Sequence, residues 1–107
     1  MMSEIKVTRT MLDKSICDCN KSVRDLLRDN GILDYDDLDA GERRKFKAIL
    51  QVGRNKEECE VSCYRAKGRG DKRIWITKVK RYAEAGDVLE IKAGYNELYV
   101  KLRSTES

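Results

Sequence analysis

One amphipathic segment followed by a series of short alternating segments is the feature that most constrains the fold of this chain. The apolar positions of the amphipathic segment are Ile16, Cys19, Val23, Leu26 and Leu27. Their spacings of mostly three or four residues are typical of one face of a helix. Asp13 or Asn20 is suited to cap the start of this helix, and Asn30-Gly31 is a typical left-handed end. The sequence therefore predicts one amphipathic helix near the N-terminus.

Segments with the alternation of β-strands make up most of the remaining chain. They cover residues 5–8, 45–52, 59–65, 73–77, 87–93 and 97–102. The alternation is clearest in Ile74-Trp75-Ile76 and in residues 98–102. Turns that contain glycine separate most of these segments, and the chain has no proline. Residues 78–84, which lie between two strands, favour a short second helix.

One helix ahead of several short strands is typical of the α+β class. We expect one N-terminal amphipathic helix packed on a curled, mostly antiparallel five- or six-stranded sheet or half-open barrel, with a short second helix. Closing a small sheet into a half-open barrel reduces the number of bare strand edges. The length of 107 residues is typical of one domain, so we expect residues 1–107 to form a single domain.

The composition argues against several classes of protein. Hydrophobic residues make up 40% and charged residues of both signs 39%, which is not typical of a disordered tail. No segment approaches the roughly 18 apolar residues of a membrane helix, and the first residues lack the apolar core of a secretory signal. We therefore expect a cytoplasmic protein with no membrane partner. The chain has no histidine, the commonest general base and metal ligand, so a binding module without a cofactor is favoured over an enzyme.

Charges of opposite sign are segregated along the chain. Residues 25–42 carry seven acidic residues and one basic residue, whereas residues 65–81 carry eight basic residues and one acidic residue. Such segregation informs about binding partners more than about the fold.

The basic segment predicts an interface with nucleic acid. Positive side chains neutralise phosphates, and glycines in the same loop allow a close approach to the backbone. Tyr64, Trp75 and Tyr82 lie among the basic residues, and aromatic rings stack on unpaired bases. The predicted contacts are Arg65, Lys67, Arg69, Lys72, Arg73, Lys78, Lys80 and Arg81. The alternative interpretation of this segment is a solvated hairpin loop beside a core tryptophan.

Two stretches of the chain carry a resemblance to a known family. They are residues 69–76, Arg-Gly-Asp-Lys-Arg-Ile-Trp-Ile, and the following Lys80-x-Tyr82-Ala83-x2-Gly86-Asp87-x-Leu89. Together they resemble a segment of DNA-binding modules associated with bacterial restriction endonucleases. In those modules a Gly-Asp-x-Arg-Ile-Trp strand precedes a short helix and a Gly-Asp strand. The resemblance covers roughly residues 64–102. At the level of the fold it points to the pseudobarrel effector domain of type IIE restriction enzymes, which plant auxin-response factors share. It implies contact with duplex DNA by the basic loops of a small barrel, with Arg65, Lys67, Arg69 and Arg73 at the basic positions and the acidic run facing away from the DNA.

The acidic run supports a different hypothesis, a small inhibitor or adaptor of the phage or mobile-element type. Its carboxylates, at Asp34, Asp36, Asp37 and Asp39, are suited to imitate phosphates in the basic groove of a host nucleic-acid-processing machine.

A third hypothesis is a Mg²⁺-dependent nuclease. Asp71 and the triplet Glu90-Ile91-Lys92 match the residue types of restriction-type sites, but Glu4-Ile5-Lys6 repeats the triplet.

The four cysteines are Cys17, Cys19, Cys59 and Cys63. Structural zinc sites favour two to four residues between paired ligands, and the first pair is separated by one. Cys59 and Cys63 are four residues apart, as are positions on one face of a strand. Buried thiols are therefore favoured, with a zinc site and disulfides as the alternatives, and no metal residues are predicted.

Overall fold

A computed structural model of the chain describes residues 2–94 and 97–104. Seven strands, three α-helices and one 3-10 helix occur in these residues. In chain order they are β1 (Met2–Lys6), α1 (Arg9–Lys14), β2 (Cys17–Asp18), α2 (Lys21–Asp29), η1 (Tyr35–Asp37), β3 (Arg43–Val52), β4 (Asn55–Arg65), β5 (Lys72–Ile76), α3 (Val79–Tyr82), β6 (Val88–Gly94) and β7 (Glu97–Arg103).

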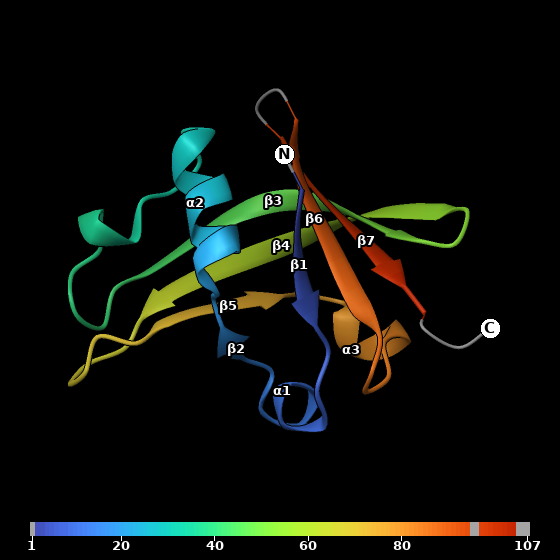
Figure 1. The fold of residues 1–107 in the computed structure, drawn as a ribbon, viewed down its shortest axis with the longest axis horizontal. Helices are drawn as coiled ribbons and strands as arrows, with labels where there is room; N and C mark the ends of the chain where they lie inside the picture. The colour runs from blue at the N-terminus through green and yellow to red at the C-terminus, as the bar shows by residue number, and fades with distance from the viewer. Residues whose placement is uncertain (1, 95–96, 105–107) are drawn as a thin grey trace.

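All the described strands belong to one sheet in the order β1-β6-β7-β3-β4-β5-β2. Neighbouring strands are antiparallel except β3 and β7, which are parallel. Figure 1 shows β3, β4 and β5 running across the view while β1, β6 and β7 cross it steeply, so that the sheet curls into a half-barrel. The predicted α+β class and the curled, mostly antiparallel sheet are confirmed.

The predicted strand number of five or six is wrong, because the described residues form seven strands. The additional strand is β2, in which Cys17 pairs with Ile74 and Asp18 with Arg73 of β5. A strand of two residues is too short to produce an alternating pattern. Its flanking residues Ile16 and Cys19 instead fitted the apolar stripe assigned to the following helix.

The predicted amphipathic helix is α2, and it begins at Lys21 rather than near Ile16. Asn20 caps it, since the Asn20 side chain accepts a hydrogen bond of 2.9 Å from the backbone N–H of Val23. The helix ends as predicted at Asn30-Gly31, where Gly31 has a φ of 69°. The N–H of Ile32 then donates to the carbonyl of Leu27 at 2.9 Å, which completes the terminating motif.

A further helix, α1, was not predicted from the sequence. Thr8 caps it by accepting a hydrogen bond of 3.1 Å from the N–H of Met11, and Ser15 ends it with a φ of 53°. Six residues are too few to show a helical stripe, and only Met11 is buried. The short second helix expected at residues 78–84 is confirmed as α3 (Val79–Tyr82).

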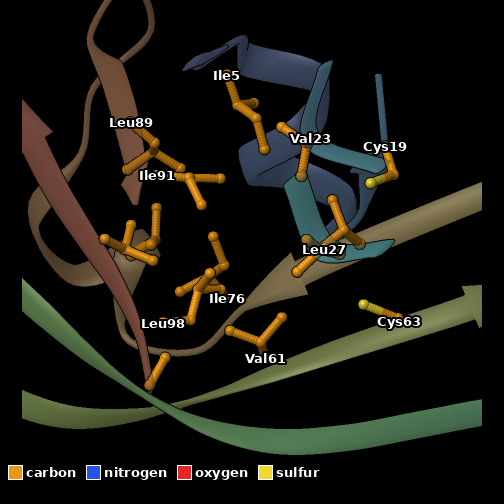
Figure 2. Close-up of a cluster of buried hydrophobic side chains, with 14 of the residues drawn as sticks. Ile5, Cys19, Val23, Leu27, Val61, Cys63, Ile76, Leu89, Ile91 and Leu98 are labelled. Carbon is orange, nitrogen blue, oxygen red and sulfur yellow. The ribbon is translucent and has the colours of Figure 1, made fainter. Parts of the chain in front are cut away.

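The core lies between α2 and the face of the sheet that the helix covers, which we call the inner face. Figure 2 shows Val23 and Leu27 of α2 opposite sheet residues such as Val61 and Leu98. All four side chains are buried. The opposite side of the sheet, which we call the outer face, carries the alternate residues of each strand. In the part of the chain that the structure describes, no helix has the length and apolarity required to span a membrane.

Candidate nucleic-acid interface

Trp75, the only tryptophan of the chain, lies on the outer face of β5. Its neighbours Ile74 and Ile76 are buried in the core, so the alternation of the strand turns the half-buried Trp75 outward. Ser62 of β4 is paired with Trp75, and Lys45 of β3 is paired with Ser62. A small hydroxyl side chain therefore lies between the indole ring and a lysine.

The next row of the outer face joins Arg43 of β3, Tyr64 of β4 and Arg73 of β5. The guanidinium carbon of Arg43 lies 5.1 Å from the centre of the Tyr64 ring, within the range of a cation–π contact. Arg73 forms ion pairs with Asp71 at 3.1 Å and Asp18 at 3.6 Å. The charge of Arg73 is thus balanced locally, whereas Arg43 makes no ion pair within the described residues.

Two hollows adjoin Trp75, and Ser15 and Thr77 line both of them. The first has a volume of about 190 Å³ and the second, which is wider, about 530 Å³. We call the two hollows together the Trp75 groove. It is lined by Ser15, Ile16, Arg43, Lys45, Glu60, Ser62, Tyr64, Ile74, Trp75, Thr77, Lys78, Lys80 and Arg81.

The Trp75 groove is strongly basic. Arg43 and Lys45 of β3 line the first hollow, on one side of Trp75, which we call one bank of the groove. Lys78, Lys80 and Arg81, at and beside α3, line the second hollow and form the other bank. Glu60 is the only acidic residue among those lining the groove, and its carboxylate is 3.8 Å from the ammonium of Lys45. Five cations against one carboxylate produce a positive potential along this part of the outer face.

Lys78, Lys80 and Arg81 were predicted as contacts, and the start of α3 determines their positions. Lys78 has a φ of 72°, and its ammonium donates to the carbonyl of Glu58 at 2.6 Å. This hydrogen bond fixes α3 against β4. Lys80 and Arg81 are exposed and make no ion pair in the described part of the chain. They are therefore the more available cations on this bank.

The other predicted contacts lie at or near the opposite end of β5, which Figure 1 shows. Lys67 and Arg69 lie in the turn between β4 and β5, Arg65 ends β4, and Lys72 and Arg73 begin β5. β5 has five residues and is about 17 Å long, so the turn lies about that far from α3. The N–H of Ala66 donates to the carbonyl of Asp71 at 2.8 Å and closes the turn. Arg69 at its tip is exposed, whereas Lys72 is half-buried and faces a mixed-charge hollow beside Asp34.

Arg65 and Lys67 are turned toward the acidic run. The Arg65 guanidinium donates to the carbonyl of Leu38 at 2.7 Å, and its Nε is buried without a partner. The side chain of Lys67 covers Gly41, where an added Cβ would lie 2.7 Å from the Cε of the lysine. Both residues thus pack against the loop that follows η1.

The acidic run lies alongside the basic turn and not away from it. The hydroxyl of Tyr35 donates to the carbonyl of Arg73 at 2.6 Å, and the N–H of Gly41 donates to the carbonyl of Arg65 at 2.6 Å. Asp34 caps η1 by accepting from the N–H of Asp36 at 2.9 Å. The two segments of opposite charge therefore share one end of the molecule.

The residues of the nuclease hypothesis are not brought together. Asp71 precedes β5, whereas Glu90 and Lys92 lie on β6, and β7, β3 and β4 separate these strands in the sheet. Glu90 is paired with Arg103 at 3.2 Å. No group of three or more histidine, cysteine, aspartate or glutamate side chains suited to a metal ion occurs within residues 2–94 and 97–104.

The cysteines are free thiols, and Cys59 and Cys63 share the inner face of β4 as their spacing predicted. Burial raises the pKa of Cys19 to about 11 and that of Cys63 to about 12. Figure 2 shows both sulfur atoms at one end of the buried cluster. Burial and the two neighbouring thiols also raise the pKa of Tyr35. These groups are neutral at pH 7 and belong to the core.

Arg43, Lys45 and Ser62, which line the groove, were not among the residues predicted from the sequence. The alternation of β3 was a usable signal, because Arg43, Lys45 and Lys47 are spaced by two residues and therefore point to one face. Their proximity to Trp75 depends on the pairing of β3 with β4 and of β4 with β5.

Comparisons with models of protein families, with curated proteins and with solved structures found no match to this chain.

Proposed function

We propose that this protein is a nucleic-acid-binding module that contacts the phosphate backbone through the Trp75 groove. One observation carries the proposal: five cationic side chains and one carboxylate line a groove on the outer face. Cations on two banks are suited to hold a strand of phosphates between them. Duplex DNA is the ligand that the sequence resemblance implies. The basic turn supplies Arg69 as an additional contact beyond the groove.

Salt dependence tests the proposal. The assay is fluorescence anisotropy with labelled duplex DNA, single-stranded DNA and RNA, in a salt series without divalent metal. Each phosphate contact on duplex DNA adds about 0.9 to the slope of log affinity against log salt, so contact by three groove cations gives a slope of about −2.7. Absence of binding to every nucleic acid at low salt would refute the proposal.

Charge reversal locates the interface. The double variant Lys80→Glu and Arg81→Glu is expected to weaken binding at least tenfold and to reduce the salt slope. The matched control is Arg54→Glu with Lys56→Glu, which changes the net charge equally at two exposed residues, one in the turn between β3 and β4 and one at the start of β4. Equal losses in the two double variants would indicate a general effect of net charge and would exclude a specific role of the groove.

A protein-binding inhibitor or adaptor is the second candidate. Asp36, Asp37 and Asp39 favour it, because they are exposed and make no ion pair within the described residues. Asp34 is left unchanged in the test because it caps η1. Under this hypothesis the triple variant Asp36→Asn, Asp37→Asn and Asp39→Asn no longer captures nucleic-acid-binding proteins from a bacterial lysate, whereas Arg69→Glu still does.

A further inference from the structure

Trp75 presents a fixed aromatic surface between the two hollows of the groove. Its ring packs partly against the core, and the flanking Ile74 and Ile76 are buried, so the side chain has little freedom to move. Tyr64 is the other aromatic residue of the groove, but the guanidinium of Arg43 lies over its ring. The indole is therefore the aromatic surface available to a ligand.

Small hydroxyl residues surround the indole. Ser15 and Thr77 line both hollows, and Ser62 lines the first. The Thr77 hydroxyl accepts a hydrogen bond of 2.8 Å from the N–H of Glu60 and keeps its own proton to donate. The hydroxyls of Ser15 and Ser62 make no hydrogen bond in the part of the chain that the structure describes. Donors and acceptors are thus placed around the indole ring, in a groove that five cations also line.

This arrangement matches an unpaired nucleotide. A nucleobase has an aromatic face and a polar edge, and its phosphates follow the strand on either side. In a paired duplex the bases are stacked on one another, so a duplex presents mainly its phosphates to the groove. A single strand presents bases and phosphates together.

We propose that the Trp75 groove receives an unpaired base stacked on Trp75, so that single-stranded nucleic acid binds more tightly than a duplex of equal length. This inference rests on the proposed function, since the cations on the two banks hold the phosphates of the same strand. Stacking of one base is expected to strengthen binding by roughly 5- to 150-fold relative to phosphate contacts alone.

The intrinsic fluorescence of the protein tests this inference directly, because Trp75 is the only tryptophan. The four ligands are an oligothymidylate, a duplex of the same length, an abasic deoxyribose-phosphate oligomer of that length, and thymidine monophosphate. The oligothymidylate is expected to quench the emission of Trp75 and to bind at least fivefold more tightly than the abasic oligomer. The abasic oligomer is expected to bind without quenching. Thymidine monophosphate that binds as tightly as the oligomer would overturn the assignment to a strand and indicate a free nucleotide.

The variant Trp75→Leu is expected to bind the oligothymidylate only as tightly as the abasic oligomer, with its affinity for the abasic oligomer unchanged. Tyr82→Leu is the matched control, since Tyr82 is 43% exposed and does not line the groove. Quenching of the wild-type protein needs no substitution and decides the matter even if Trp75→Leu does not fold. Failure of all polyanions to bind at low salt would overturn the proposed function. Binding of duplex and abasic oligomer without preference for the oligothymidylate, and without quenching, would overturn only the stacking.

Discussion

Replacing Arg65 with methionine separates a structural role of this residue from a role in binding. Arg65 was predicted as a phosphate contact, but its guanidinium donates to the carbonyl of Leu38 at 2.7 Å and ties the loop after η1 to the end of β4. Methionine keeps most of the aliphatic length and removes the donors. The carbonyl of the buried Leu38 then loses the hydrogen bond from Arg65.

The magnitude follows from the type of bond. A hydrogen bond to a charged donor contributes about 1.5–3 kcal/mol, so Arg65→Met is expected to lower the free energy of unfolding by about 2 kcal/mol. For 107 residues, an unfolding entropy of about 2.1 cal/mol/K per residue converts this loss into a fall in Tm of about 9 °C. Urea unfolding followed by circular dichroism and a thermal scan measure both quantities.

Arg69→Met is the control, because it removes the same charge from the exposed tip of the same turn. Its expected effect on stability is within about 0.5 kcal/mol. In nucleic-acid binding the order reverses: Arg69→Met weakens binding modestly, and Arg65→Met leaves the salt slope unchanged at a temperature where it is folded. Equal stability of the two variants would refute the structural role assigned to Arg65.

Two further predictions concern the core and its edges. The side chain of Asn20 caps α2 and also donates to the carbonyl of Glu4 on the edge strand β1 at 3.0 Å. Asn20→Ala removes both interactions and is expected to lower the free energy of unfolding by about 2 kcal/mol. Asn20→Ser keeps the cap and is expected to lower it by about half as much, as measured by urea unfolding. Burial raises the pKa of the Cys63 thiol from 9.0 to about 12, so as the pH rises the unfolded chain loses this proton before the folded chain does. The contribution of the neutral thiol to the free energy of unfolding is therefore complete below about pH 9 and decreases toward pH 12. Urea unfolding at pH 8 and pH 10 measures the decrease, which Cys63→Ala should reduce; a decrease of the same size in this variant would assign the effect to other groups.

The parts of the fold with a strong local pattern were predictable from the sequence. The helix stripe and the Asn30-Gly31 ending identified α2, and the alternation identified β5 and β7. Two short elements, α1 with six residues and β2 with two, were not predicted because neither shows a recognisable period, whereas the short α3 was expected between two strands. Ile16 and Cys19 have helical spacing to Val23 but lie before the cap at Asn20, where the chain is extended.

Charge segregation along the chain did not become segregation in space. The acidic run and the basic turn have opposite signs, and backbone hydrogen bonds such as that from Gly41 to Arg65 hold them side by side. The basic groove is instead assembled from cations that are far apart in sequence, Arg43 and Lys45 on β3 and the cations around α3, because the strand register carries both groups to Trp75. A prediction from sequence would have needed the pairing of β3, β4 and β5 to place Arg43 and Lys45 beside Trp75. For this reason the outer-face row that contains Lys45, Ser62 and Trp75 is a better target for mutagenesis than the more conspicuous basic turn.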